Sequence, residues 1–182
     1  VGYQNIKQLI SNQVPTVSGT TGWLDKQEEI NALTAAKNTA FFYASNFSVG
    51  VNIFFNLNKV LAKLMNNFPD YTIDMEEIHH IHKKDAPSGT AITLAEGIFE
   101  NIPSKTDWKL DKAEEATDLP IIAKRIDEVP GTHIIDYRSE IDTIEISHTA
   151  HNRQGFAGGA VLAAEWLKEK KGVFGMEDLL NL

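Results

Sequence analysis

Residues 76–91 read Glu76-Glu77-Ile78-His79-His80-Ile81-His82-Lys83-Lys84-Asp85-Ala86-Pro87-Ser88-Gly89-Thr90-Ala91. Imidazole and ammonium groups are concentrated from His79 to Lys84, and a Pro-Ser-Gly-Thr turn follows directly. We predict that a strand over 71–82 leads into a helix over 89–101, with Ser88 as its cap. Proton-transfer groups beside free helix amides indicate a catalytic site for a small anion.

The composition is that of an ordinary globular protein, with 182 residues, 42% of them apolar and 23% charged. The net charge of −8 argues against nucleic acid or an anionic membrane as a partner. The absence of cysteine excludes disulfides, thiolate metal sites and a cysteine nucleophile, and it fits a cytoplasmic protein. No apolar run is long enough to cross a bilayer, and the first residues do not resemble a signal peptide.

The order of predicted elements indicates an α/β unit followed by an α+β domain. A helix over 4–12, a strand over 14–18, a helix over 26–37 and a strand over 39–43 follow the rhythm of a doubly wound parallel sheet. Beyond residue 48 we expect a long helix over 49–66, a loop or broken helix over 103–120, and a last helix over 156–170. Strands over 121–126, 132–137 and 143–148 are separated by turn sequences, which favours an antiparallel meander.

The division into domains follows from this order. Residues 1–48 resemble the second half of a Rossmann-like dinucleotide-binding domain. The first half of such a domain contains a Gly-x-Gly-x-x-Gly turn, and this chain has no such turn. Residues 49–182 are predicted to form the substrate-binding, catalytic and oligomerisation domain, with a mixed or antiparallel sheet flanked by helices. An alternative is that residues 156–182 pack back on the nucleotide-binding part.

Three interpretations compete for the histidine-rich segment. It is a solvated strand end, a metal site or an acid–base site. A metal needs imidazoles that converge, whereas on a strand His79 points away from His80 and His82, so we expect no metal. On the same strand His79 and Lys83 share a side, which suits proton transfer near a cation.

Other candidate positions lie at the ends of predicted elements. The amides of Gly89 and Thr90 fall in the first turn of a helix, where carboxylate or phosphate binds. The loops 19–22 and 44–47 follow predicted strands, where ligands of open α/β sheets bind, although their spacing alone slightly favours two plain turns. The residues His148, His151 and Arg153 are weaker candidates at the rim of a site.

The segment His79–Ala91 resembles the signature of the dihydrodipicolinate reductase family, also called 4-hydroxy-tetrahydrodipicolinate reductase. Three further segments agree with the family in the same order: 17–23, 44–52 and 153–160. The resemblance covers nearly the whole chain.

The resemblance implies an enzyme of the diaminopimelate route to lysine. Such an enzyme reduces a cyclic dicarboxylate, 4-hydroxy-tetrahydrodipicolinate, to tetrahydrodipicolinate with NADH or NADPH, and it typically forms a homotetramer through the sheet of its C-terminal domain. By position in the signature, His79 is the acid–base residue and Lys83 its proton-donating partner, and His80, Gly89 and Thr90 hold the substrate. The cofactor side is lined by Gly19, Thr20, Thr21, Ala44, Ser45, Asn46 and Phe47.

The chain departs from the family at its N-terminus, where relatives carry roughly another half of the Rossmann fold. We expect the sequence to be a piece of a longer enzyme, with Val1-Gly2-Tyr3 as the remnant of a strand. The alternative hypothesis is a truncated, non-catalytic protein that binds a dicarboxylate or oligomerises.

Overall fold

The structure, a computed structural model, describes residues 1–182. Contacts within the chain divide it into two compact units. The first unit contains Val1–Asn52 and Gln154–Leu182, and the second contains Ile53–Arg153. The C-terminal segment therefore belongs with the N-terminal one, which is the alternative that the sequence left open. The nucleotide-binding and substrate-binding roles of the units stay predictions.

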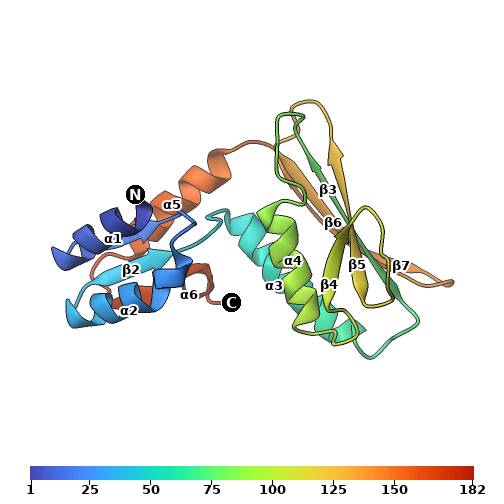
Figure 1. Cartoon of the computed structure of the whole chain (residues 1–182), viewed down its shortest axis with the longest axis horizontal. Coiled ribbons are helices and arrows are strands. Elements are labelled where there is room, and N and C mark those ends of the chain that lie inside the picture. Colours follow the sequence, from blue (N-terminus) through green and yellow to red (C-terminus); the bar gives the residue numbers. More distant parts are fainter. The chain divides into compact units, whose positions relative to one another are not determined.

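The first unit is a small parallel sheet between helices. Its elements are α1 (Gly2–Ser11), β1 (Thr16–Ser18), the 3-10 helix η1 (Leu24–Lys26), α2 (Gln27–Ala36), β2 (Ala40–Tyr43), the first residues of α3 (Val49–Met65), α5 (Gln154–Trp166), β8 (Gly172–Phe174) and α6 (Met176–Leu180). The strand order is β1-β2-β8, and both pairings are parallel (Figure 1).

Both faces of this sheet are covered, as expected for parallel strands. Phe41 and Phe42 are neighbours on β2 and lie on opposite faces because strand side chains alternate. Phe41 packs in the cluster formed with α1 and α2, and Phe42 in the cluster formed with α5 and α6. The predicted doubly wound α/β arrangement is confirmed.

The second unit is a mixed sheet with two helices on one face (Figure 1). Its elements are the remainder of α3, β3 (Thr72–His79), α4 (Gly89–Phe99), β4 (Asp107–Leu110), β5 (Asp118–Arg125), β6 (Gly131–Arg138) and β7 (Thr143–Ala150). The strand order is β4-β5-β3-β6-β7. Strands β4, β5 and β3 are parallel to one another, whereas β6 is antiparallel to β3 and β7 to β6.

The alternation along β3 decides what faces the helices. Ile73 and Met75 are buried in the core that α3 and α4 form with the sheet. Glu77 and His79 continue the same alternation and are also buried, so the helix-covered face changes from apolar to ionisable at the carboxyl end of β3. This change positions the candidate site.

Three expectations for the second unit are wrong. The strands after residue 120 do not form a meander, because β3 lies between β5 and β6 and pairs with both. The segment 103–120 is not a loop or broken helix, since it contains β4 and the start of β5. Strand β3 ends at His79 rather than at His82. Long-range pairing with β3 outweighs the local turn sequences from which the meander was predicted.

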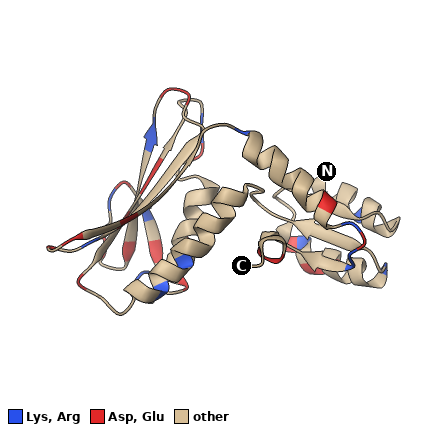
Figure 2. Cartoon of the chain, turned by 180° about the vertical axis from the view of Figure 1, so that it is seen from behind, with Lys and Arg blue, Asp and Glu red and all other residues tan.

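Charged residues of both signs are spread over the chain (Figure 2). Acidic and basic residues are interspersed along the elements of both units (Figure 2). No helix of the chain has both the length and the apolar character that crossing a bilayer requires.

Candidate active site at the carboxyl end of β3

Glu77 is a fully buried carboxylate at the centre of the candidate site. Its Oε2 accepts a hydrogen bond from the backbone N–H of Ser88 (3.0 Å), and its Oε1 accepts one from Arg125 Nη2 (3.0 Å). Burial by itself raises the pKa of Glu77, but the hydrogen bonds from Ser88 and Arg125 outweigh burial and hold the pKa below its ordinary value. Glu77 is therefore a carboxylate at neutral pH.

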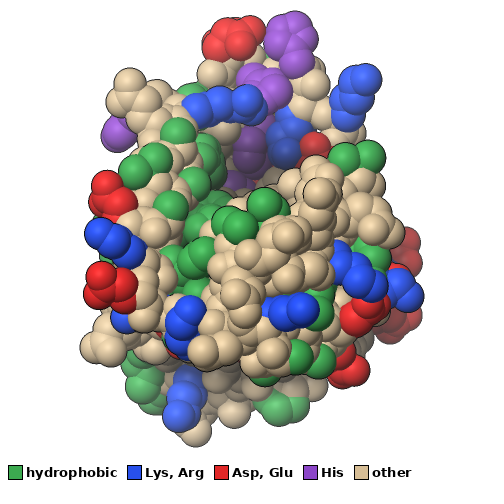
Figure 3. Space-filling model, turned by 90° about the vertical axis from the view of Figure 1, so that its left-hand side faces the viewer, with side chains coloured by type: hydrophobic (Ala, Val, Ile, Leu, Met, Phe, Trp, Pro, Cys, Tyr) green, Lys and Arg blue, Asp and Glu red, His purple; other side chains and the backbone are tan.

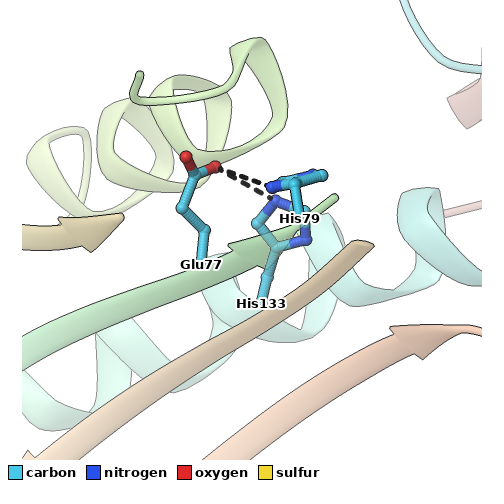
Figure 4. Close-up of side chains that lie close together, drawn as sticks. All are labelled: Glu77, His79 and His133. Atoms are coloured by element: carbon cyan, nitrogen blue, oxygen red, sulfur yellow. Dashed lines mark ion pairs between the residues drawn. The ribbon is translucent and has the colours of Figure 1, made fainter. Parts of the chain in front are cut away.

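His79 lies beside this carboxylate, with Nδ1 3.5 Å from Glu77 Oε2 (Figure 4). The contact is close enough for charge interaction, but Nδ1 has no hydrogen-bond partner. Burial lowers the pKa of His79, Glu77 opposes this, and the nearby Lys83 and Arg125 lower the pKa further. The imidazole is thus neutral near pH 7 and ready to take up a proton.

A second buried imidazole belongs to β6. The ring of His133 meets that of His79 edge-on at 5.1 Å, and its Nε2 lies 3.8 Å from Glu77 Oε2. His133 Nε2 also shares a 3.2 Å hydrogen bond with the hydroxyl of Ser88. Burial, with His79 nearby, lowers the pKa of His133 to about 4. Gly131 makes room for the pair, because a Cβ there would lie 3.1 Å from His79 Nε2.

The N-terminus of α4 lies against the same carboxylate. Ser88 caps the helix as predicted, since its Oγ accepts from the backbone N–H of Ala91 (3.1 Å). The amides of Gly89 and Thr90 make no hydrogen bond within the protein. Gly89 is exposed, and a Cβ there would meet nothing within 4 Å. Free amides at the positive end of a helix suit a carboxylate ligand.

The loop between β3 and α4 places a cation, the ammonium group of Lys83, near His79. Lys83 Nζ pairs with Asp85 Oδ2 at 2.7 Å, and this contact holds the pKa of Asp85 below its ordinary value. Arg125 Nη2 also donates to the carbonyl of Asp85 (2.7 Å), so β5 fixes the course of the loop. The peptide bond between Ala86 and Pro87 is cis.

The structure brings most of the predicted catalytic and substrate-binding residues to one junction. His79 and the segment with Lys83, Gly89 and Thr90 all belong to the turn from β3 to α4. His80 is half-buried just beyond the strand, with its ring 6.2 Å from that of His82. His82 is exposed and lies 3.5 Å from Glu128, outside this group. Figure 3 shows several histidine side chains close together near the top of that view, with basic side chains beside them.

The predicted cofactor-side residues lie in the first unit, in two loops that touch. Gly19, Thr20 and Thr21 follow β1, and the segment from Ala44 to Phe47 follows the neighbouring parallel strand β2. The Ala44 amide donates to the carbonyl of Ser18 (3.2 Å), and a Cβ on Gly19 would lie 3.0 Å from the Phe47 ring. Carboxyl ends of adjacent parallel strands are where such sheets bind ligands.

Sequence reasoning missed Glu77, Arg125 and His133 as members of the site. Glu77 was available from the strand period, because it lies two residues before His79. The other two depend on strand pairing, in which Glu77 is opposite His133 on β6 and His79 is opposite Arg125 on β5. Such pairing between distant segments is not visible in local sequence.

Glu77, His79 and His133 place three potential metal ligands within 4.8 Å of one another. The carboxylate is already hydrogen-bonded to Ser88 and carries the guanidinium of Arg125, which repels a cation. The arrangement therefore suits proton transfer better than metal binding, and the expectation of no metal stays a prediction.

Comparison with known proteins shows the family to which the chain belongs. A family model described as the C-terminus of dihydrodipicolinate reductase matches residues 50–180. The chain is 53% identical to the 4-hydroxy-tetrahydrodipicolinate reductase of Christiangramia forsetii, over 98% of this chain and 74% of the relative. It is 36% identical to that of Methanoregula boonei, over 98% of this chain and 70% of the relative.

A solved structure is similar as well. Dipicolinate-bound dihydrodipicolinate reductase from Paenisporosarcina sp. TG-14 matches with a TM-score of 0.75 and 26% identity, covering 98% of this chain and 70% of that one. The fold, the site and the relatives together define an oxidoreductase. The chain belongs to the dihydrodipicolinate reductase family, which confirms the resemblance seen in the sequence.

Proposed function

We propose that the protein reduces 4-hydroxy-tetrahydrodipicolinate to tetrahydrodipicolinate with NADH or NADPH, in the diaminopimelate route to lysine. One observation carries the proposal most directly. A neutral buried imidazole and a helix N-terminus with two free amides meet at the turn from β3 to α4. A cyclic dicarboxylate has negative charges that the amides attract, and its ring is where the imidazole acts as an acid–base group.

The residues of the second unit have separate roles in this proposal. Gly89 and Thr90, together with His80, hold a carboxylate of the substrate at the start of α4. His79 and Lys83 manage the proton, with the imidazole as acid–base group and the ammonium as donor. The similar solved structure is of a dihydrodipicolinate reductase with dipicolinate bound, which supports a planar dicarboxylate as the ligand class.

The nicotinamide, when bound, supplies the hydride. The loops after β1 and β2 fit the nicotinamide side of such a cofactor, because Gly19, Thr20, Thr21 and Ser45 are exposed at adjacent strand ends. Phe47, at the end of the second loop, is buried and packs against Gly159 of α5. We propose Ala44 and Asn46 as further members of this lining.

The protein is proposed to work in the cytoplasm as a homotetramer. The absence of cysteine supports a reducing compartment. The sheet face of the second unit that carries no helix supports assembly through that sheet (Figure 1).

Replacing His79 tests the reaction. His79→Gln should lower kcat by at least about a hundredfold, since general acid–base groups contribute on that scale. The readout is loss of reduced-nicotinamide absorbance with substrate present. His82→Gln is the control, because His82 is exposed and outside the group, and its kcat should be unchanged. An active His79→Gln variant would remove His79 from the mechanism.

A binding experiment separates the enzyme from a non-catalytic dicarboxylate binder. Calorimetric titration with pyridine-2,6-dicarboxylate, with and without NADH, should show binding of both ligands if the proposal holds. Binding of the dicarboxylate without any binding of NADH or NADPH favours the non-catalytic alternative. Binding of neither ligand contradicts both.

A further inference from the structure

Glu77 is fully buried and contacts several of the groups that surround the proposed proton-transfer and anion-binding site. Its carboxylate lies 3.0 Å from the Ser88 amide, 3.0 Å from Arg125 Nη2, 3.5 Å from His79 Nδ1 and 3.8 Å from His133 Nε2 (Figure 4). These groups come from the turn before α4 and from β5, β3 and β6. A single side chain therefore connects four segments of the second unit.

Stability alone gives a weak reason for such a group. A buried ion pair commonly contributes no more than apolar residues of the same size, because both charges lose their hydration. The core just before it, with Ile73 and Met75 on the same strand face, shows that apolar side chains suit this environment. The charge of Glu77 is better explained by what it does to its neighbours.

We propose that Glu77, held by Arg125, is the positioning residue of the site, which fixes His79 relative to the N-terminus of α4 and keeps a negative charge beside its imidazole. This inference rests on the proposed function, in which His79 transfers the proton and α4 holds the dicarboxylate. Glu77 itself touches no substrate. It acts through His79 on one side and through the Ser88 amide on the other.

The geometry of His79 supports this role. Its Nδ1 is buried without a hydrogen-bond partner, and the group it faces is Glu77 Oε2. Catalytic hydrogen bonds are often long in the ligand-free state and shorten when the substrate is bound. A proton on Nδ1 directed at Glu77 leaves Nε2 as the reactive nitrogen, since the partner of one ring nitrogen sets the state of the other.

The charges around His79 act in opposite directions. Glu77 on the same strand and Asp85 in the loop favour the protonated imidazole. Lys83 in the loop and Arg125 on β5 disfavour it, and the neutral ring of His133 on β6 packs edge-on against it. Removing the Glu77 charge should therefore lower the pKa of His79, and removing the Arg125 charge should raise it.

Glu77→Gln separates the charge from the hydrogen bond. The amide oxygen of glutamine can still accept from the Ser88 N–H, so α4 keeps its start and KM should change by less than about threefold. A lower pKa makes the His79 imidazole a weaker proton acceptor, so kcat near neutral pH should fall, by up to about tenfold for each step of one in that pKa. A purely structural role would instead change KM or the yield of folded protein.

The test compares Glu77→Gln with Glu76→Gln in the whole protein. Glu76 is the adjacent residue on the opposite sheet face, where it pairs with Lys124 at 2.6 Å. The first measurement is the pKa of the His79 imidazole by NMR, with the His79→Gln spectrum identifying the signal. The second is the pH profile of kcat and KM.

We expect Glu77→Gln to lower the His79 pKa and kcat, and Glu76→Gln to change neither. Arg125→Gln should shift the His79 pKa upward, which keeps the test decisive if Glu77→Gln does not fold. A His79 pKa that does not move in Glu77→Gln, or that moves downward in Arg125→Gln, overturns the proposal. The NMR result needs no turnover, so a wild-type protein without reductase activity would refute the proposed function and leave this result standing.

Discussion

His133 links the site to the stability of the second unit, because it is a buried imidazole whose pKa lies at about 4. An unfolded histidine titrates near 6.5, so the unfolded chain binds a proton in the window from pH 6.5 down to 4 that the folded chain does not bind. The stability of the folded state therefore falls as the pH drops through this window. The lowered pKa values of His79 and His148 act in the same direction.

We predict that His133→Gln flattens this part of the stability profile. The pKa difference at His133 corresponds to about 3 kcal/mol of stability lost by pH 4, and the variant should recover most of it relative to its own value at pH 7. Urea unfolding at several pH values measures the effect. His151→Gln, at an exposed position, is the control. Parallel profiles for wild type and His133→Gln would contradict the prediction.

At the scale of single residues, the part of this site that could be predicted from the sequence lies in one continuous segment. His79, Lys83, Gly89 and Thr90 were predictable because they lie in one run with a specific order. Arg125 and His133 were not, because they join the site only through pairing of β3 with β5 and β6. The local spacing that placed His82 in a strand also failed, since β3 ends three residues earlier.

Among the elements, α5 shows how a single glycine sets the packing of a helix against a loop. A Cβ on Gly159 would lie 1.7 Å from the carbonyl oxygen of Phe47, which a side chain cannot occupy. The helix thus approaches the loop after β2 backbone to backbone. The neighbouring Gly158 faces open space, with nothing within 4 Å of a Cβ.

These two glycines should respond to alanine with opposite signs. Gly159→Ala forces α5 away from Phe47 and should destabilise the first unit by about 2 kcal/mol or more. Gly158→Ala should stabilise it by up to about 1 kcal/mol, because alanine favours a helix interior. Unfolding followed by the fluorescence of Trp166, which lies in α5, compares the two. Equal effects from both variants would be inconsistent with the close approach.

The elements themselves were predicted unevenly. Helices α3 and α4 have long apolar periods, and their predicted ends agree within two residues. Strand β4 was missed because four residues among charged neighbours give no clear alternation. Strand β8 and helix α6 were missed because they are also short. Strand β8 is defined by its pairing with β2, which is not visible in the local sequence.

For the whole molecule, the mixed sheet has one face that no helix of the second unit covers (Figure 1). Alternation places Ile78, Ile122 and Ile134 on the face opposite α3 and α4, where the side chains of Glu76 and Lys124 also lie. Ile122 is 37% exposed. Isoleucines that alternate with charged residues on an open sheet face suit contact with a second copy.

The proposed tetramer should depend on this face. Ile134→Lys places a charge among the apolar side chains of this face and should convert tetramers of the 20.2 kDa chain into smaller species. Val14→Lys, in the loop of the first unit between α1 and β1, is the control and should leave the mass unchanged. Light scattering after size-exclusion chromatography gives the mass. A tetrameric Ile134→Lys variant would show that assembly uses another surface.

The order in which the two units appear along the chain has a consequence for synthesis on the ribosome. The second unit is one uninterrupted stretch, so every strand of its sheet has been translated by Arg153. The first unit is split, and β2 receives its second neighbour only when β8 is made, after the whole of the second unit. Because domains fold as units while the chain is synthesised, the proposed proton-transfer site can assemble before the first sheet is complete. The second unit is therefore the part that a nascent chain can finish first.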